Sequence, residues 1–268
     1  MLTNTLPADH QRVSGVTVLF DQVFVVRQVT REVEVYDLNT LNLTSRLPVD
    51  GLVYPKDLTS SNKFRCLYIS DWRGREIHRV ELGGATTRWK VNDLPFGLSV
   101  MPDPDFHLLV TCGEARKLKE FKTNGHLVRE ILLQEDLVHA FHAIQFDGQF
   151  IVSHGWDSDP LNRICIVNST GHVTRCYGGP PGSAAGQLNV PRYLAVDGEG
   201  NVIVADWNNE RVLLLNKTLD YVGDLVSTHN SGKSELRPRR LCLAVSRGRL
   251  FVADGGQNDV LVFQVGDG

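Results

Sequence analysis

The sequence predicts an all-β fold in which one structural repeat occurs six times around a closed ring. Three observations support this prediction. One segment has the pattern of four short strands joined by turns, its second strand recurs six times, and the last copy ends one strand early. Self-similarity with a period of about 20 to 50 residues is typical of repeat architectures, so the repeat decides the fold.

The clearest copy of the repeat spans residues 191–226, PRYLAVDGEGNVIVADWNNERVLLLNKTLDYVGDLV. It contains a short apolar run, a turn at DGEGN, a run of strand-forming residues ending at Asp206, a polar loop, the run RVLLLN, another turn and a fourth run. Runs of β-branched and apolar residues bounded by Gly, Asn and Asp are typical of strands joined by tight turns. This segment therefore predicts a four-stranded antiparallel sheet.

The second strand of this template recurs along the whole chain. Successive copies end 41 to 52 residues apart, at Arg27, Asp71, Cys112, His154, Asp206 and Asp254. That spacing suits one four-stranded blade per repeat, which takes about 40 to 50 residues in propellers. The longer spacings contain the insertions WDSDPLN, GGPPGSAAGQ and STHNSGKSELR. We expect a single domain over residues 1–268, with blades at roughly 13–50, 51–92, 93–134, 138–178, 188–227 and 236–265.

The two ends of the chain predict how the ring closes. The first strand of a blade begins at a recurring motif, PKDL at 55, PFGL at 95, PRYL at 191 and PRRL at 238, with AFHAI at 140 as the divergent copy. The last repeat stops after its third strand, VLVFQV at 260–265, and the one unused segment lies within residues 2–12. A strand from that segment would complete the last blade and remove exposed sheet edges. The prediction is a six-bladed β-propeller of four-stranded antiparallel blades, closed by the N-terminal strand.

The string NVIVADWNNERVLLLN, with PRYLAVDGEG ahead of it, resembles an NHL repeat. Six such units resemble the C-terminal propeller of tripartite-motif (TRIM-NHL) proteins, and the likeness is strongest in the fifth copy. The resemblance implies a domain that binds RNA or proteins, within a longer parent protein whose RING and B-box could supply ubiquitin-ligase activity. The related amidating lyases imply a third alternative, a metal-dependent lyase.

Composition and charge limit the kinds of partner and the cellular compartment that the sequence predicts. The formal net charge of −3 provides no global attraction to nucleic acids or anionic membranes. The first residues have no signal-peptide pattern, and no apolar run reaches the roughly 18 residues of a membrane span. We therefore expect a cytoplasmic protein that contacts no membrane, excised from a larger parent. Glycosylation sequons occur at Asn42, Asn168 and Asn216, where Asn is interpreted as an ordinary turn residue.

The five cysteines are scattered and follow no metal-binding spacing. We expect reduced, mostly buried thiols at Cys66, Cys112, Cys165, Cys176 and Cys242. A two-residue turn at Thr170-Gly171 would place Cys165 opposite Cys176 on neighbouring strands, but the expectation is that they are not bridged.

The loops that follow the second strands emerge on one face, where propellers usually bind their partners. Three of these loops carry tryptophan, a residue enriched in binding hot spots. The residues predicted to bind a protein partner are Trp72, Trp156, Trp207, Arg73, Phe96 and His142. The alternative for the tryptophans is packing between blades. Asp71, Asp206 and Asp254 end second strands, where we expect their carboxylates to cap loop amides.

A second ring of residues follows the proline of the first strand and offers an RNA-binding alternative. It contains Lys56, Phe96, Arg192 and Arg239, with His142 in the divergent repeat. Interleaved cations and rings suit single-stranded or stem-loop RNA. The residues predicted for this alternative are Lys56, Arg192, Arg211, Arg237, Arg239 and Arg240, with Lys233 nearby. Acidic residues on the same face, Glu135, Asp136, Asp157, Asp159 and Asp259, leave it near neutral, which favours a protein partner.

Enzymatic motifs are not found in the sequence. There is no nucleophile elbow, phosphate-binding loop, zinc-protease helix or dinucleotide fingerprint. His142 and His154 share one repeat, but two imidazoles fall short of the three protein ligands of catalytic zinc. We expect no catalytic residue, no metal or other cofactor and no small-molecule substrate in this domain.

Overall fold

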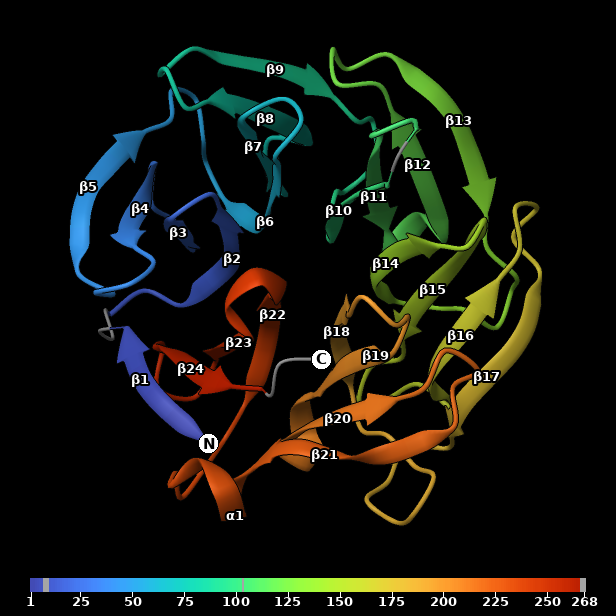
Figure 1. The fold of residues 1–268 in the computed structure, drawn as a ribbon. Helices are drawn as coiled ribbons and strands as arrows, with labels where there is room; N and C mark the ends of the chain where they lie inside the picture. The colour runs from blue at the N-terminus through green and yellow to red at the C-terminus, as the bar shows by residue number, and fades with distance from the viewer. Residues whose placement is uncertain (7–9, 103, 266–268) are drawn as a thin grey trace.

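The computed structural model describes residues 1–6, 10–102 and 104–265. Residues 7–9, inside the range predicted for the closing strand, and residues 103 and 266–268 lie outside the described residues. The described chain forms six four-stranded antiparallel sheets around a central axis (Figure 1). The predicted six-bladed β-propeller is confirmed.

Each blade contains four strands, numbered from the axis outward. The inner strands are β2 (Val13–Leu19), β6 (Pro55–Ser61), β10 (Leu98–Val100), β14 (Ala140–Phe146), β18 (Pro191–Val196) and β22 (Pro238–Ala244). The second strands are β3 (Gln22–Arg27), β7 (Cys66–Asp71), β11 (Leu108–Cys112), β15 (Gln149–His154), β19 (Val202–Asp206) and β23 (Arg249–Asp254). All six second strands end at the predicted residues.

The third and outer strands complete the blades. The third strands are β4 (Glu32–Asp37), β8 (Glu76–Glu81), β12 (Lys117–Phe121), β16 (Asn162–Val167), β20 (Arg211–Leu215) and β24 (Val260–Gln264). The outer strands are β5 (Leu43–Pro48), β9 (Thr86–Lys90), β13 (Leu127–Leu132), β17 (Val173–Gly179), β21 (Tyr221–Ser227) and β1 (Leu2–Leu6). The outer strands are more exposed than the strands inside them.

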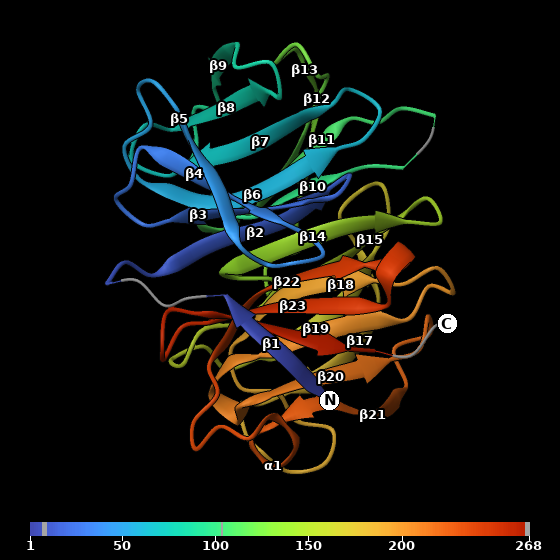
Figure 2. The same ribbon diagram turned by 60° about the vertical axis from the view of Figure 1, so that its left-hand side comes forward.

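The N-terminal strand closes the ring as predicted. Strand β1 pairs antiparallel with β24, and Leu6 lies opposite Val260. Figure 2 shows β1 running beside the strands of the last blade. Among the described residues, helical structure is confined to α1 (Thr228–Ser231) and to short 3-10 turns at Gly113–Ala115, Trp207–Asn209 and Val245–Arg247. Within the described residues, no helix has the length and apolar character to cross a membrane.

The hydrophobic core is divided into six clusters, one between each pair of neighbouring blades. Strand β7 shows how one blade supplies two of them. Leu67 and Ile69 pack toward the first blade, whereas Cys66 and Tyr68 pack toward the third. Successive side chains of a strand point to opposite faces, and here both faces are covered. Such strands are therefore apolar throughout rather than alternating with polar residues.

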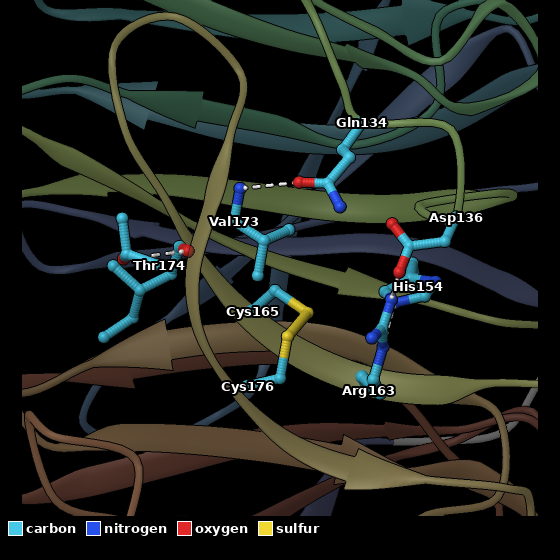
Figure 3. The surroundings of a disulfide bond; sticks show 9 residues. Gln134, Asp136, His154, Arg163, Cys165, Val173, Thr174 and Cys176 are labelled. Carbon is cyan, nitrogen blue, oxygen red and sulfur yellow. Dashed lines mark hydrogen bonds and ion pairs between the residues drawn. A yellow bond between two sulfur atoms is a disulfide. The ribbon is translucent and has the colours of Figure 1, made fainter.

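The expectation of five reduced cysteines is wrong for one pair. Cys165 on β16 and Cys176 on β17 are opposite each other, as the predicted turn requires, and they form a disulfide (Figure 3). Their Cα atoms lie 4.2 Å apart, close enough for the two sulfur atoms to bond. Cys66, Cys112 and Cys242 are free thiols. The turn predicted the register, whereas the bond depends on both side chains pointing to the same face of the blade.

Candidate functional site

The candidate site lies at one end of the central channel. We call this end of the propeller the top face: here the inner strands begin, and the second strands end. Five of the inner strands, β2, β6, β14, β18 and β22, have the same irregularity at their start. The pairing of β6 with β7 passes from Pro55 opposite Asp71 to Asp57 opposite Ser70, so that Lys56 is an extra residue. Such a β-bulge re-aims the side chain of the extra residue.

The same bulge occurs in β2, β14, β18 and β22, where the extra residues are Ser14, Phe141, Arg192 and Arg239. The sequence had assigned His142 to this ring in the fourth blade. The structure places Phe141 there instead. The prediction was wrong because the divergent segment AFHAI obscures the start of the bulge. His142 instead corresponds to Asp57, one residue further into the channel. We call the set Lys56, Phe96, Phe141, Arg192 and Arg239 the mouth.

Below the mouth, side chains from four blades join across the channel and close it. Asp57 accepts a hydrogen bond from the Tyr193 hydroxyl at 3.1 Å, between blades on opposite sides of the ring. Arg240 Nε lies 3.2 Å from the Asp57 carboxylate, and Arg240 Nη2 donates to the Lys56 carbonyl at 2.6 Å. His142 stacks on Tyr193 with 3.7 Å between ring centroids and contacts the Leu98 carbonyl at 3.0 Å through Nε2. We call Asp57, His142, Tyr193 and Arg240 the plug.

The plug residues are buried, and their pKa values shift accordingly. Burial raises the pKa of Asp57 to about 6, although Arg240 and the backbone amides of Leu98 and Leu58 oppose the shift. Burial lowers the pKa of His142 to about 3, so its imidazole is neutral and its Nε2–H donates to Leu98. A neutral imidazole and a paired carboxylate suit a structural network. The plug separates the mouth from a lower cavity of about 340 Å³, which the inner strands line.

The cations of the mouth lie against aromatic rings. Arg192 is 4.5 Å from the centroid of the Trp156 ring and 4.4 Å from that of Trp207. Arg239 approaches the Trp207 ring at 5.8 Å. Lys56 lies 4.2 Å from the Phe96 ring and 5.7 Å from the Trp72 ring. Cation–π contacts therefore position all three cations.

A cavity of about 270 Å³ opens beside these cations on the top face. Its aromatic wall is continuous, because Phe96 contacts Phe141 and Phe141 contacts Trp156, with ring centroids 5.6 and 5.4 Å apart. Lys56, Glu114 and His139 supply its polar groups. The sequence singled out Phe96, Trp156 and Lys56 but not Phe141. An aromatic pocket with a few polar groups is the usual form of a ligand or side-chain site.

The mouth holds its cations without ion pairs. Over the described part of the chain, Lys56, Arg192 and Arg239 form no salt bridge, and the buried Nε atoms of both arginines have no hydrogen-bond partner. Burial and the guanidinium groups of Arg239, Arg240 and Arg192 lower the pKa of Lys56 to about 7. Burial also lowers the pKa values of Arg192 and Arg239, yet both side chains remain charged at neutral pH.

The other basic residues of the RNA-binding prediction are paired with carboxylates. Arg211 pairs with Asp206 at 2.9 Å, and Lys233 pairs with Asp259 at 2.8 Å. Arg237 contacts Glu235 at 3.0 Å and Glu210 at 3.6 Å. Arg240 belongs to the plug. The predicted RNA-binding residues are therefore divided among the mouth, the plug and paired surface positions, and they form no continuous track.

The predicted aromatic residues also differ in accessibility. Trp156 is 38 % exposed. Trp207 packs toward the last blade, where its ring atoms would contact a Cβ added at Gly255. The Trp72 indole nitrogen is buried, and the ring lies 5.9 Å from that of Tyr54, which Arg73 covers. Trp72 and Trp207 are thus half-buried against neighbouring groups, while Trp156 is exposed on the top face.

The carboxylates at the ends of the second strands have the predicted capping role. Asp71 accepts hydrogen bonds from the amides of Val53, Tyr54 and Gly74. Asp206 accepts one from the Asn189 amide, and Asp254 accepts one from the Arg237 amide. Because each aspartate ties its loop to the preceding interblade segment, it orders the rim around the mouth.

The histidines of the fourth blade do not converge. His142 is in the plug, whereas His154 accepts a hydrogen bond from Arg163, which also pairs with Asp136 (Figure 3). In the described ranges, no group of three or more His, Cys, Asp or Glu residues is placed to hold a metal ion.

Replacing Lys56 with Met is expected to raise the free energy of unfolding near neutral pH by about 1 to 3 kcal/mol, because it removes a half-buried ammonium that forms no salt bridge with any described residue and is repelled by three arginines. The wild type carries a pH-dependent cost. Since burial lowers the pKa of Lys56 to about 7, the unfolded chain binds more protons between about pH 7 and its ordinary value of 10.5, and wild-type stability rises with pH there. The advantage of Lys56→Met should therefore shrink over that window.

Urea denaturation near pH 6.5 and near pH 10 measures this difference in stability. These two pH values bracket most of the range between the pKa of Lys56 in the folded protein and its ordinary value. Lys122→Met, at an exposed lysine, is the matched control and should change stability little at either pH. A Lys56→Met protein less stable than the wild type at neutral pH would contradict the prediction.

The comparisons with known proteins show the fold. No family model matches the chain, and no curated protein sequence does. Among solved structures, it is similar to hydrazine synthase from Kuenenia stuttgartiensis, with a TM-score of 0.70, 14 % identity and 100 % of each chain covered. It is similar to virginiamycin B lyase from Staphylococcus aureus, with a TM-score of 0.65, 13 % identity, and 98 % of this chain and 88 % of the other covered.

A Bacteroides thetaiotaomicron protein of unknown function has a TM-score of 0.76 at 12 % identity, covering 95 % of this chain and 69 % of the other. Identities this low establish the fold alone. The chain is a six-bladed β-propeller, and its function must be argued from its own residues.

Proposed function

We propose that this propeller is a non-enzymatic recognition domain that binds a protein partner through the mouth on its top face. As the resemblance to NHL repeats implies, it would be the target-recruiting module of a larger TRIM-like protein. The observation that carries the proposal is the convergence of unpaired cations and an aromatic cavity at one point of the ring.

The residue types at the mouth support binding to a protein. Tryptophan and arginine are enriched in binding hot spots, and hot spots lie in pockets near the centre of an interface. Trp156 and Arg192 are in contact here, beside the cavity. The rigid blades hold these side chains in place, so that binding requires little ordering of the site.

The distribution of charge favours a protein over RNA. RNA affinity depends on many phosphates meeting separate cations along a track. On this face Arg211, Arg237 and Lys233 already pair with carboxylates. One local cluster of cations suits a single anchoring residue better than a polynucleotide backbone.

The cytoplasmic location predicted from the sequence is part of this proposal. The state of Cys165 and Cys176 tests it, because the cytosol keeps thiols reduced and oxidising compartments preserve disulfides. Mass spectrometry after alkylation of intact cells would report that state. Alkylation of both cysteines supports a cytoplasmic location, and a preserved bond contradicts it.

Panning a phage-displayed random-peptide library on the propeller tests the proposed function. We expect enriched peptides whose affinity falls at least about tenfold in a Phe96→Ala/Trp156→Ala variant, since truncated hot-spot residues typically cost more than 1 kcal/mol. Phe20→Ala is the matched control, because Phe20 is an exposed ring at the opposite end of the blades. Peptides that bind both variants alike, or no enrichment, would contradict the proposal.

A further inference from the structure

Three cations from three different blades gather at the mouth without an internal counter-ion. Lys56, Arg192 and Arg239 lie close enough that the two guanidinium groups lower the pKa of the Lys56 ammonium. Arg192 and Arg239 flank the same Trp207 ring. Arg12, which precedes β2, adds a fourth positive charge that lowers the pKa values of both arginines. Their mutual repulsion is a cost of the folded state.

Buried charges in proteins are normally paired, because an unpaired ion loses its hydration without compensation. Arg192 is only 8 % exposed and Arg239 only 5 %, yet neither forms a salt bridge within residues 1–6, 10–102 and 104–265. Asp57 cannot serve them, because it is bonded to Arg240, Tyr193 and two backbone amides in the plug. The two guanidinium groups therefore have no paired carboxylate among the described residues, and an anion from outside the fold would compensate their charge.

The plug limits how such an anion reaches the site. Along β6, Lys56 is at the mouth, Asp57 is in the plug and Leu58 borders the lower cavity. The same order holds along β22 for Arg239, Arg240 and Leu241. The mouth is thus a blind cup that opens only toward the top face. It suits a side chain or a chain end rather than a strand threaded through the propeller.

We propose that the mouth binds a carboxylate: an acidic side chain of an extended partner segment lies between Lys56, Arg192 and Arg239, and an apolar residue beside it fills the aromatic cavity. This inference rests on the proposed function and specifies the partner's chemistry. Carboxylates are complementary to guanidinium groups because they accept charge-assisted hydrogen bonds, in paired form where geometry permits. The cavity of Phe96, Phe141 and Trp156 adjoins the cations and takes the neighbouring side chain.

Two features favour a carboxylate over a phosphate of RNA. Arg192 and Arg239 lie against the Trp207 ring and Lys56 lies against the Phe96 ring, so the ring faces that these cations occupy are not free for base stacking. Glu114 and Asp157 act electrostatically on Lys56 and Arg192, which weakens the local attraction for a polyanion. An RNA strand brings one negative charge per nucleotide, whereas a peptide can bring a single carboxylate.

Carboxylate binding should take up a proton above neutral pH. Because burial and the neighbouring arginines lower the pKa of Lys56 to about 7, the free protein loses this charge as pH rises, whereas a bound carboxylate favours the charged form. Affinity should therefore fall as pH rises through about 7. The groups facing Lys56 are Arg192, Arg239, Arg240 and Glu114, and His139 shares the cavity and pairs with Asp159. If the decrease of affinity with rising pH persists in His139→Gln and disappears in Lys56→Met, the proton is taken up by Lys56.

The test uses the peptides enriched from the random library, each also synthesised with Asp and Glu replaced by Asn and Gln. We expect acidic peptides, with the neutral version binding at least roughly 30-fold more weakly, because losing one partner of a desolvated charge pair is costly. Arg192→Met and Arg239→Met should cause similar losses for the acidic peptide and little change for the neutral one. Arg31→Met, at an exposed arginine on the same face, is the matched charge control.

The outcomes separate the two proposals. Peptides that need Phe96 and Trp156 but bind equally well in their neutral form would overturn the carboxylate site and leave the proposed function standing. Peptides that ignore the mouth, or no peptides, would overturn both. A random RNA pool that binds the wild type, fails to bind Arg192→Met and shows a steep salt dependence would replace the carboxylate with phosphates. The comparison of each acidic peptide with its Asn and Gln version uses only the wild-type protein. The test therefore remains decisive even if a protein variant fails to fold.

Discussion

Replacing Asp57 with Asn is expected to lower the free energy of unfolding by about 3 to 5 kcal/mol, because it leaves a buried charge without its partner. Arg240 is only 2 % exposed, and Asp57 is the carboxylate that pairs with it. The Tyr193 hydroxyl would also lose its charged acceptor. Since these residues join blades two, five and six, the loss should destabilise the ring as a whole.

A double-mutant cycle checks the reason for this loss. Arg240→Met should also destabilise the protein, whereas Asp57→Asn/Arg240→Met should lose clearly less than the sum of the single variants. Urea denaturation followed by tryptophan fluorescence measures all four proteins. Additive losses, or a single-variant loss below about 1 kcal/mol, would show that the pair in the plug is not coupled.

Replacing Cys165 and Cys176 with Ala is expected to lower stability by about 3 kcal/mol in the oxidised protein, through the loss of the loop constraint in the unfolded chain. The two cysteines are 11 residues apart in sequence, and Cys165 is fully buried. The wild type in the presence of a reductant is the matched control and should approach the stability of the variant. Equal stability of the wild type with and without reductant would contradict the prediction.

Thiol titration in denaturant provides an independent measurement. The unreduced wild type should titrate three thiols, those of Cys66, Cys112 and Cys242. After reduction, all five cysteines should react. Five reactive thiols without reduction would mean that Cys165 and Cys176 are not bridged.

The repeat predicted the architecture because strand patterns and turns are local properties. Every second strand ends where the pattern indicates, and the missing last strand predicted the pairing of β1 with β24. Local pattern failed in the fourth blade, where AFHAI obscured the bulge. His142 was assigned to the mouth, and the position belongs to Phe141. One residue of register exchanges a ring at the mouth for an imidazole in the plug.

The candidate site was predicted in part for the same reason. Lys56, Arg192 and Arg239 each follow a repeated proline, so the repeat predicts that they lie at the same end of the ring. Their lack of ion pairs was not, because pairing depends on which carboxylates lie nearby in space. Arg211 and Arg237 looked equally basic in the sequence, yet both are neutralised.

The sequence by itself determined the number of blades, the strand order and the closing strand, since these follow from hydrophobic patterning and turns within about 45 residues. Only the tertiary structure decided that Asp57 meets Tyr193, 136 residues away, and that Cys165 bonds to Cys176. The blades radiate from one axis, so residues from distant repeats converge there without any local pattern recording it. The plug and the charge balance of the mouth are properties of that convergence.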